Sequence, residues 1–425
     1  MRKRAWSSTA IAASTTITGR ICSSALYSAG RSSKRRPAIA VLSGGSRMRL
    51  MASDIIWKWP SSRHHRCRTQ GILMFLNGLG TANPPQRYTK AQCWDAFKAS
   101  EWFRRLDRRA HAIAETVLLR DNGIEARRLA LAALDEVFAI DADTLHRRFA
   151  THAPALAAEA GAKALADAAL APADIDAVVI STCTGYLCPG LSSYMVERLG
   201  LRRDIQLFDL VGQGCAAALP NWRLAKALLT GRDARQVLSI CVEVSSAAMY
   251  LDNDPGVLIS ACLFGDGAGA AVLSAEPQPR RRRIEFTTAL SLVNPDQRDA
   301  LRFESRQGLL RNVLTRPVPQ LAASHARKLL DDALVEAGLA QSDITAWILH
   351  AGGRDVLKAL QARLDVTTDE LGYSAATLRE YGNLSSAFVY FVLQAALADR
   401  APAGWWWMSS FGAGFSCHGA LLRVA

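Results

Sequence analysis

The segment FDLVGQGCAAALPNWRLAKALL, Phe208 to Leu229, places a cysteine at the point where an apolar strand passes into a helix. Gly212 and Gly214 permit a tight turn before Cys215, and three alanines that favour a helix follow it. A thiol at a helix N-terminus faces free N–H groups and the positive end of the helix dipole, which lower its pKa toward the thiolate. Pro220 either kinks this helix or moves its regular start downstream. These features leave a nucleophile and an inert buried thiol equally open.

Strands and helices alternate on both sides of this segment. Apolar, β-branched runs predict strands, and runs of helix-forming residues predict helices. The run 74–97 is typical of a strand, a Gly/Pro turn and an amphipathic helix. Further helices are predicted at 153–170, 192–201, 319–339, 354–364 and 385–400, and strands at 174–185, 204–212, 235–244, 267–277, 344–353, 404–414 and 418–425.

A polar break at 277–283 divides the body of the chain. On its two sides, the segments LAPADIDAVVIST and LAQSDITAWILHA share one order: a helix ending in Leu, a polar linker with Asp-Ile, and a buried strand. This repeat predicts an α/β fold in which two related halves pack together with helices between their sheets. We therefore expect a leader at 1–70, a first half with the cysteine at 71–277 and a second half at 278–425.

Length and composition indicate a globular protein. The chain has 425 residues, of which 50% are hydrophobic, so it can bury a large core. Arg, Lys or Asp interrupts every apolar run before it reaches the roughly 18–20 residues that a bilayer span needs, so no transmembrane segment is expected. Nine scattered cysteines lack the pairing or density of a disulfide scaffold. We predict a cytoplasmic enzyme or binding protein with reduced thiols.

The net charge of +13 belongs to the leader, which holds fourteen of the 51 basic residues and one of the 38 acidic residues. Beyond position 70, 37 residues of each sign remain. The body is therefore formally neutral, and no nucleic-acid partner is expected for it. The leader is rich in Ser, Thr, Ala and Arg, and three interpretations stay open: a transit peptide, a disordered basic tail, or sequence translated from a misplaced start codon.

Two polar residues of the second half lie at similar junctions. His350 closes the strand in AWILHAGG, and Asn383 in EYGNLSSAFVYF comes just before an apolar helix. Taken singly, a lone His is usually a satisfied core or surface residue, and Asn before a helix is a favoured N-cap. Together with Cys215, they place a thiol, an imidazole and a carboxamide where α/β sheets carry their active sites, which favours one shared site.

These three side chains fit acyl transfer to a thiolate, with two donors available to hold an oxyanion. Decarboxylation of a malonyl thioester produces an enolate, so it chiefly requires donors around the thioester carbonyl. The enolate then attacks the acyl-cysteine carbonyl in a Claisen condensation. A nearby Asp or Glu would repel the developing charge, which explains an Asn in this role.

Five motifs carry a family resemblance. GQGCAAAL, CLFGDGAGAAVL, WILHAGG, YGNLSSA and FGAG occur in the order and approximate spacing of type III polyketide synthases, the chalcone synthase-like branch of the thiolase superfamily. The resemblance runs from about Met74 to the C-terminus. It implies a five-layer αβαβα thiolase-like fold, a homodimer, acyl-CoA and malonyl-CoA as substrates, and no metal or bound cofactor.

The same resemblance implies roles for individual residues. Cys215 resembles the acyl-accepting nucleophile, and His350 with Asn383 resembles the decarboxylation and oxyanion pair. Phe264 resembles the gatekeeping aromatic between the entry tunnel and the cavity, with a core Phe as the alternative. The basic residues expected at the tunnel mouth, with an exposed helix face as the alternative, are Arg120, Arg127 and Arg128. The expected cavity positions are Cys183, Cys188, Ser245, Ala248, Ser260 and Ser385. For the two cysteines these are cavity and dimer-facing positions, and a second reactive thiol stays open for Cys183.

Departures from the plant pattern bear on the product. Plant chalcone synthases carry TTSG, HPGG and FGPG where this chain has TCTG, HAGG and FGAG. Ala248 is smaller than the usual Thr and leaves volume for a long or bulky acyl chain. This favours a bacterial-type enzyme that makes resorcinols, pyrones or phloroglucinols over a chalcone-forming enzyme. The alternatives are a single-round β-ketoacyl synthase III-like enzyme and a Cys-His-Asn thioester hydrolase.

Overall fold

The computed structural model describes residues 73–279 and 281–425, so the predicted leader lies outside the described residues. The strands are β1 (Met74–Ala82), β2 (Arg87–Thr89), β3 (Ala126–Arg128), β4 (Ala177–Ser181), β5 (Gln206–Leu210), β6 (Gln236–Glu243), β7 (Gly267–Ser274), β8 (Ile284–Val293), β9 (Leu301–Arg306), β10 (Leu309–Leu314), β11 (Ile344–Leu349), β12 (Gly404–Gly412) and β13 (Ser416–Val424). The α-helices are α1 (Lys90–Ala99), α2 (Glu101–Arg105), α3 (Arg108–Leu119), α4 (Ala142–Ala168), α5 (Leu191–Leu199), α6 (Ala218–Gly231), α7 (Pro255–Leu263), α8 (Val318–Ala337), α9 (Arg354–Leu364), α10 (Gly372–Tyr381) and α11 (Phe388–Ala398).

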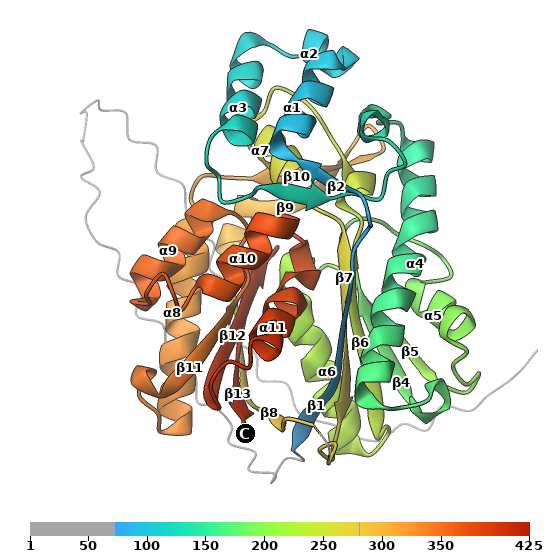
Figure 1. The fold of residues 1–425 in the computed structure, drawn as a ribbon, viewed down its shortest axis with the longest axis vertical. Coiled ribbons are helices and arrows are strands. Elements are labelled where there is room, and N and C mark those ends of the chain that lie inside the picture. Colours follow the sequence, from blue (N-terminus) through green and yellow to red (C-terminus); the bar gives the residue numbers. More distant parts are fainter. Residues whose placement is uncertain (1–72, 280) are drawn as a thin grey trace, which may run out of the picture. The chain divides into compact units, whose positions relative to one another are not determined.

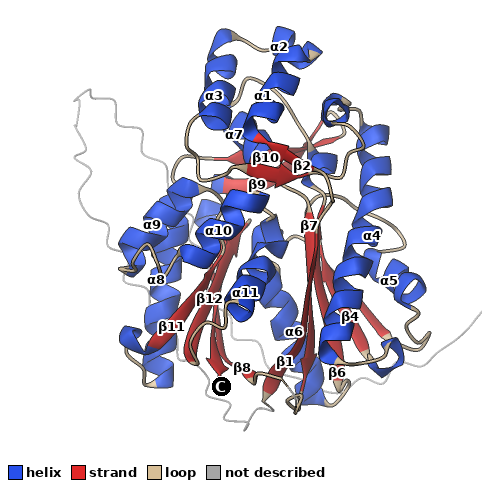
Figure 2. Ribbon diagram, viewed as in Figure 1, coloured by secondary structure: helices blue, strands red, loops and turns tan. Residues whose placement is uncertain are grey.

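One mixed sheet runs through both predicted halves in the order β11-β12-β13-β8-β1-β7-β6-β4-β5 (Figure 2). Strand β4 is parallel to β5 and β6, and β7 runs antiparallel to β6 and β1. The halves meet where β1 pairs with β8, at Met74 opposite Phe286 and Phe75 opposite Glu285. The boundary between the two halves at 277/278 stays a prediction. The strands on its two sides hydrogen-bond to one another within a single sheet.

The elements stack in five layers, which confirms the predicted αβαβα sandwich (Figure 1). Helices α4 and α5 cover the outer face of β4, β6 and β7. Helices α6 and α11 lie between the two parts of the sheet, and α8 and α9 cover the outer face of β11, β12 and β13. Because both faces are covered, strands such as β4 and β7 are buried along their whole length and have nearly continuous apolar sequences.

Glycines let the longest helix lie directly on the sheet. A Cβ atom added at Gly78 of β1 would lie 2.1 Å from the Ala164 carbonyl oxygen, and one at Gly80 would lie 2.3 Å from that of Ala160. Helix α4 begins eleven residues before its predicted start at 153, because Pro154 is accommodated inside it. The GLG sequence in β1 therefore serves close packing rather than a turn.

A smaller region above the sheet was only partly predicted. Helices α1 and α3 pack on α7 through an apolar cluster that includes Trp94, Phe97 and Leu258. The antiparallel hairpin β9–β10 and helices α7 and α10 were not predicted, because their sequences are short or lack a clear apolar period. These elements matter for function, since α7 and the hairpin form part of the pocket described below.

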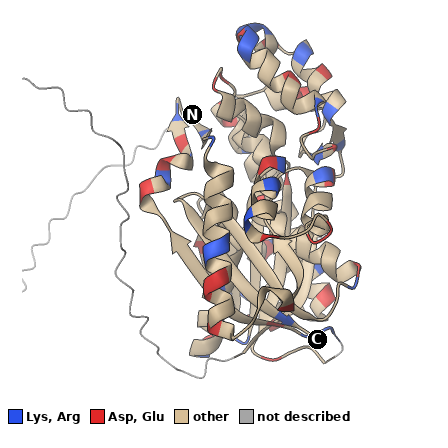
Figure 3. Cartoon of the chain, turned by 90° about the vertical axis from the view of Figure 1, so that its left-hand side faces the viewer, with Lys and Arg blue, Asp and Glu red and all other residues tan. Residues whose placement is uncertain are grey.

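Charged residues of both signs are distributed over the outer elements, and the central strands carry few of them (Figure 3). Within the described ranges, no helix combines the length and the apolar character that a membrane crossing requires.

Candidate active site

Cys215 lies in a short 3-10 turn, η3 (Gly214–Ala216), between β5 and α6. Regular α-helix begins only at Ala218, so Pro220 falls in the first turn, where its missing N–H group leaves no hydrogen bond unmade. Of the two alternatives for this proline, the structure shows the second, in which the regular helix starts downstream of Cys215. A Cβ atom added at Gly412 would lie 3.0 Å from the backbone nitrogen of Cys215. The end of β12 therefore packs directly on the cysteine turn.

The thiol of Cys215 is held in its neutral form. Loss of solvent raises its pKa to about 12, although the Ser385 hydroxyl, which donates to Sγ at 3.2 Å, acts in the opposite direction. The negative charge of Glu243 raises the pKa further. The expectation that the helix N-terminus lowers this pKa was wrong, because burial and a nearby carboxylate outweigh the single 3-10 turn around the sulfur.

His350 follows β11 and sits in an aromatic pocket. Its ring packs edge-on against Phe388, with centroids 5.3 Å apart, and lies 4.9 Å from the ring of Phe411. Its backbone N–H donates to the carbonyl of Ser409 at 2.9 Å. Neither ring nitrogen has a hydrogen-bond partner among the described residues. Burial lowers the pKa of His350 to about 3, so the imidazole is neutral at physiological pH.

Asn383 lies between α10 and the 3-10 turn η7 (Ser385–Ala387) that leads into α11. Its Oδ1 accepts from the backbone N–H of Ser385 at 2.9 Å, and its Nδ2 donates to the Gly352 carbonyl at 3.3 Å. This i to i+2 bond is an Asx turn and not a helix cap: the N-cap residues of η7 and α11 are Leu384 and Ala387, and neither provides a side-chain cap, so the N-cap alternative for Asn383 was wrong. The same amide also ties the η7 turn to the glycine loop that follows His350.

The three predicted residues gather around one segment, 383–388. Cys215 contacts it through Ser385, His350 contacts it through Phe388, and Asn383 is its first residue. The segments are far apart in the chain, and the pairing of β11 with β12 together with the position of α11 brings them to one end of the sheet.

A carboxylate that was not predicted lies beside the thiol. Glu243, fully buried at the end of β6, accepts hydrogen bonds from the Ser386 hydroxyl, from the Thr184 hydroxyl at 3.1 Å, and from the Cys183 backbone N–H at 3.0 Å. The Ser385 hydroxyl lies within hydrogen-bond distance of both Glu243, at 3.1 Å, and Cys215 Sγ, and its single hydrogen can serve one of them at a time. Burial raises the pKa of Glu243, and these donors counteract the shift.

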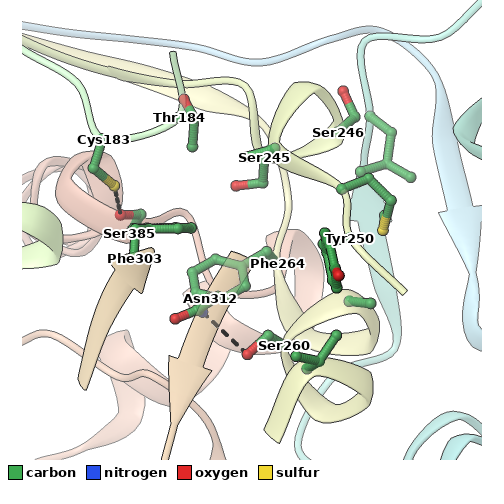
Figure 4. A pocket seen from close by; sticks show the side chains of 15 residues that line it. Cys183, Thr184, Ser245, Ser246, Tyr250, Ser260, Phe264, Phe303, Asn312 and Ser385 are labelled. Atoms are coloured by element: carbon green, nitrogen blue, oxygen red, sulfur yellow. Dashed lines mark hydrogen bonds between the residues drawn. The ribbon is translucent and has the colours of Figure 1, made fainter. Parts of the chain in front are cut away.

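A pocket that is partly open to solvent adjoins this segment (Figure 4), and about 520 Å³ of atom-free space, the solvent at its mouth included, lies between its walls. Six of the seven predicted gatekeeper and cavity residues line it: Cys183, Ser245, Ala248, Ser260, Phe264 and Ser385. Phe264 ends α7 and forms a parallel bridge with Asn383, so the predicted gatekeeper is adjacent to the site. Cys188 is exposed and does not line the pocket, because its loop turns outward before α5.

The remaining pocket wall was not identified from sequence. It comes mostly from the segments around η4 (Ser245–Ala248), from α7 and from the β9–β10 hairpin, with one residue after β3 and one after β4, and none of these segments carries a motif that marks its side chains as pocket-facing. These additional residues are Leu129, Thr184, Ser246, Met249, Tyr250, Val257, Ala261, Phe303 and Asn312.

The structure does not support the predicted CoA contacts of two arginines. Arg127 is buried, and its guanidinium donates to the carbonyls of Ala261 at 2.7 Å and Phe264 at 3.1 Å. Arg128 is paired with Glu380 at 2.8 Å. Arg127 therefore holds the backbone between Ala261 and Phe264 from inside, whereas Arg120 is exposed and its contact with CoA stays a prediction.

Among residues 73–279 and 281–425, no group of three or more His, Cys, Asp or Glu side chains is arranged to hold a metal ion. The expectation that the enzyme works without a metal or bound cofactor stays a prediction.

Two family models match the chain. One describes FAE1/type III polyketide synthase-like proteins and matches residues 107–294, and the other describes the C-terminal domain of chalcone and stilbene synthases and matches residues 285–425. The 3,5-dihydroxyphenylacetyl-CoA synthase of Streptomyces toyocaensis is 29% identical over 360 residues, which cover 81% of this chain and 89% of that enzyme. The crystal structure of PKS-I from the brown alga Ectocarpus siliculosus is similar with a TM-score of 0.76 and 25% identity, covering 84% of this chain and 100% of that one.

These matches define the class of protein, together with the thiolase-like sandwich and the polar residues gathered at one end of its sheet. The protein is an acyltransferase of the polyketide synthase type. More specifically, the chain belongs to the type III polyketide synthases, a family that uses acyl-CoA and malonyl-CoA as substrates.

Proposed function

We propose that Cys215 carries the acyl starter and the growing chain, while His350 and Asn383 hold the thioester oxygen during decarboxylation and condensation. The observation that carries this proposal is that both unbonded nitrogens of His350 are buried among aromatic rings beside the segment that also contacts the Cys215 sulfur. A buried polar group without a partner is costly, so its natural partner is a substrate atom.

The resting protonation states set the order of events. The Cys215 thiol has a pKa of about 12 and the His350 imidazole a pKa of about 3, so both are neutral at physiological pH. These values do not support a thiolate–imidazolium ion pair in the enzyme before substrate binds. We propose that the thiol proton passes to His350 only as the sulfur attacks the acyl-CoA carbonyl. The proton then leaves with the CoA thiolate, which restores a neutral imidazole whose N–H donates to the malonyl thioester oxygen.

We propose a ring-closed, resorcinol-type product. The similar Streptomyces enzyme is named for a 3,5-dihydroxyphenyl product, and the pocket of this chain combines small side chains such as Ala248 with several hydroxyl groups. A pocket of this character can hold a chain that has been extended more than once and folded on itself.

We also propose a homodimer that uses the exposed edge of β5. Leu207 is 39% exposed, Val211 just beyond the strand is 70% exposed, and Tyr186 on the adjoining loop is 72% exposed. An edge strand next to large exposed apolar side chains is a surface that pairing with a second copy would cover. A cytoplasmic location and the absence of a bound cofactor belong to the same proposal.

Incubation with a panel of acyl-CoA starters and malonyl-CoA, with product masses read by mass spectrometry, tests the proposal. Products extended at least twice and cyclised support it. A single condensation would favour a β-ketoacyl synthase-like reaction, and CoA release without malonyl-CoA would favour a thioester hydrolase. The matched variant is Cys215→Ala, with Cys188→Ala, an exposed cysteine outside the pocket, as the control.

A further inference from the structure

One wall of the pocket is a strand whose register is firmly held. Side chains alternate along a β-strand, and on β10 Arg311 points away from the pocket that Asn312 lines. Arg311 contacts three carboxylates, those of Asp252 at 3.1 Å, Asp254 at 3.3 Å and Glu304 at 3.1 Å. These contacts link the hairpin to the start of α7 and thereby hold Asn312 in the wall.

The hydrogen bonds of α7 determine how the Asn312 amide is oriented. The Ser260 hydroxyl donates its single hydrogen to the carbonyl of Gly256 at 2.8 Å, so its oxygen is left to accept. The Nδ2 of Asn312 donates to this oxygen at 3.0 Å (Figure 4). The other amide atom, Oδ1, is then directed elsewhere, and this buried oxygen has no partner among the described residues. Asn312 is 9% exposed, so bulk water does not supply one.

A second pocket residue has an unpartnered buried polar atom. The Oγ of Ser245 is buried and forms no hydrogen bond within the described part of the chain. Elsewhere in the wall, Cys183 and Ser385 are bonded to one another and to Glu243. Two residues of the pocket wall therefore hold a buried polar atom without a partner: the acceptor Oδ1 of Asn312 and the hydroxyl of Ser245.

We propose that Asn312 is a specificity-determining residue that accepts a hydrogen bond from an enol or phenol hydroxyl of the polyketide, while Ser245 donates to a neighbouring carbonyl oxygen. The inference rests on the proposed function and deepens it. A ketone oxygen would face the lone pairs of Oδ1, whereas the enol form of the same unit offers an O–H group. Enolisation moves one proton from carbon to oxygen, so an enolised β-diketone carries the hydroxyl and the carbonyl that these two residues need.

Binding of product-like ligands tests this proposal without any turnover. Orcinol, a 1,3-dihydroxybenzene, and its dimethyl ether have the same ring and oxygen positions, but only orcinol can donate. By isothermal titration calorimetry on the full chain, orcinol is expected to bind about tenfold more tightly than the ether. Asn312→Leu, which has nearly the same shape but no acceptor, should abolish this preference, and Asn312→Asp, which keeps an acceptor oxygen, should retain it.

Equal binding of the two ligands to the unmodified protein, no detectable orcinol binding, or a preference that survives Asn312→Leu would overturn the proposal. If Asn312→Leu does not fold, Ser260→Ala replaces it, because loss of the hydroxyl that orients the amide should lower the preference about threefold. The proposed function fails separately, if the unmodified protein makes no malonyl-dependent product. In an active enzyme, Asn312→Leu should lower the ratio of aromatic product to lactone about tenfold at equal CoA release.

Discussion

The surroundings of Glu243 and of His350 differ sharply, although both residues are buried beside the same segment. Glu243 accepts hydrogen bonds from side chains and backbone on all sides, whereas the His350 ring contacts aromatic rings and has no hydrogen bond to either nitrogen. The first arrangement is complete without a ligand and holds the loops around Cys183 and Ser385 in place. The second leaves two nitrogens without a partner, and the proposed function assigns that partner to the substrate. The comparison thus separates a carboxylate that holds loops in place from an imidazole that is available to bind a ligand.

The largest effect should follow from removal of the sulfur. Cys215→Ala should lower malonyl-dependent product formation at least about a thousandfold, because Cys183, a thiol that lines the pocket, holds a different position. Product masses and total CoA release measure the change. Cys188→Ala should retain activity, and equal losses in both variants would contradict a specific role for Cys215.

Replacement of the His350 imidazole, whose nitrogens have no hydrogen-bond partner among the described residues, should lower activity without lowering stability. His350→Leu should lower the rate of malonyl-CoA decarboxylation about a hundredfold by removing an oxyanion donor. The free energy of unfolding should stay within about 1 kcal/mol or rise, because the lost nitrogens have no partner in the protein. Chemical denaturation and CO₂ release measure the two quantities.

His418 offers the matched control. It is also buried, but its Nδ1 is bonded to the Ser291 hydroxyl at 2.7 Å. His418→Leu should therefore lower the free energy of unfolding by about 1 kcal/mol and leave decarboxylation intact. The reverse pattern, with activity lost at His418 and kept at His350, would exclude the proposed assignment.

The comparison also predicts a pH dependence of stability. The pKa of His350 is lowered to about 3 in the folded chain, so its contribution is fully present above the ordinary value near 6.5 and is lost as the pH falls toward 3. Between pH 7 and pH 5, the unmodified protein should lose about 2 kcal/mol more than His350→Leu. Urea unfolding at the two pH values measures the difference, and parallel losses in both proteins would show that the ring is not buried in its neutral form.

The smallest effect should come from the charge of Glu243. Because this charge raises the pKa of Cys215, Glu243→Gln should speed alkylation of the thiol by iodoacetamide at pH 8 by about threefold. Glu285→Gln, on β8 and paired with Arg283, serves as the control and should leave the rate unchanged. Slower alkylation of Glu243→Gln would show that the carboxylate lowers the pKa of the Cys215 thiol instead of raising it.

Much of the fold was predictable because strand and helix runs in this chain are long and apolar. Helix α9 has the predicted bounds, Arg354–Leu364, and the strands around Cys215 and His350 lie where their apolar runs indicate. The β9–β10 hairpin was missed because its sequence, with charged side chains on one face, lacks a continuous apolar run. Its position over the pocket depends on contacts with α7 that no local pattern encodes.

The site was predictable only where a motif marks it. Short glycine-flanked motifs identified the segments of Cys215, His350 and Asn383, and the structure brings these segments together. Glu243 was missed because a single carboxylate at the end of a buried strand has no spacing signal. The burial of Arg127 was missed for a related reason, since charge in a sequence does not reveal which side chains point inward.

The most direct test of the account is the mass of the protein after brief exposure to an acyl-CoA starter without malonyl-CoA, followed by peptide mapping. The account predicts one acyl group on the peptide that contains Cys215, its loss when malonyl-CoA is added, and no acyl group on the Cys215→Ala variant. An acyl group on Cys183 instead, or product formation with Cys215 unmodified, would contradict it.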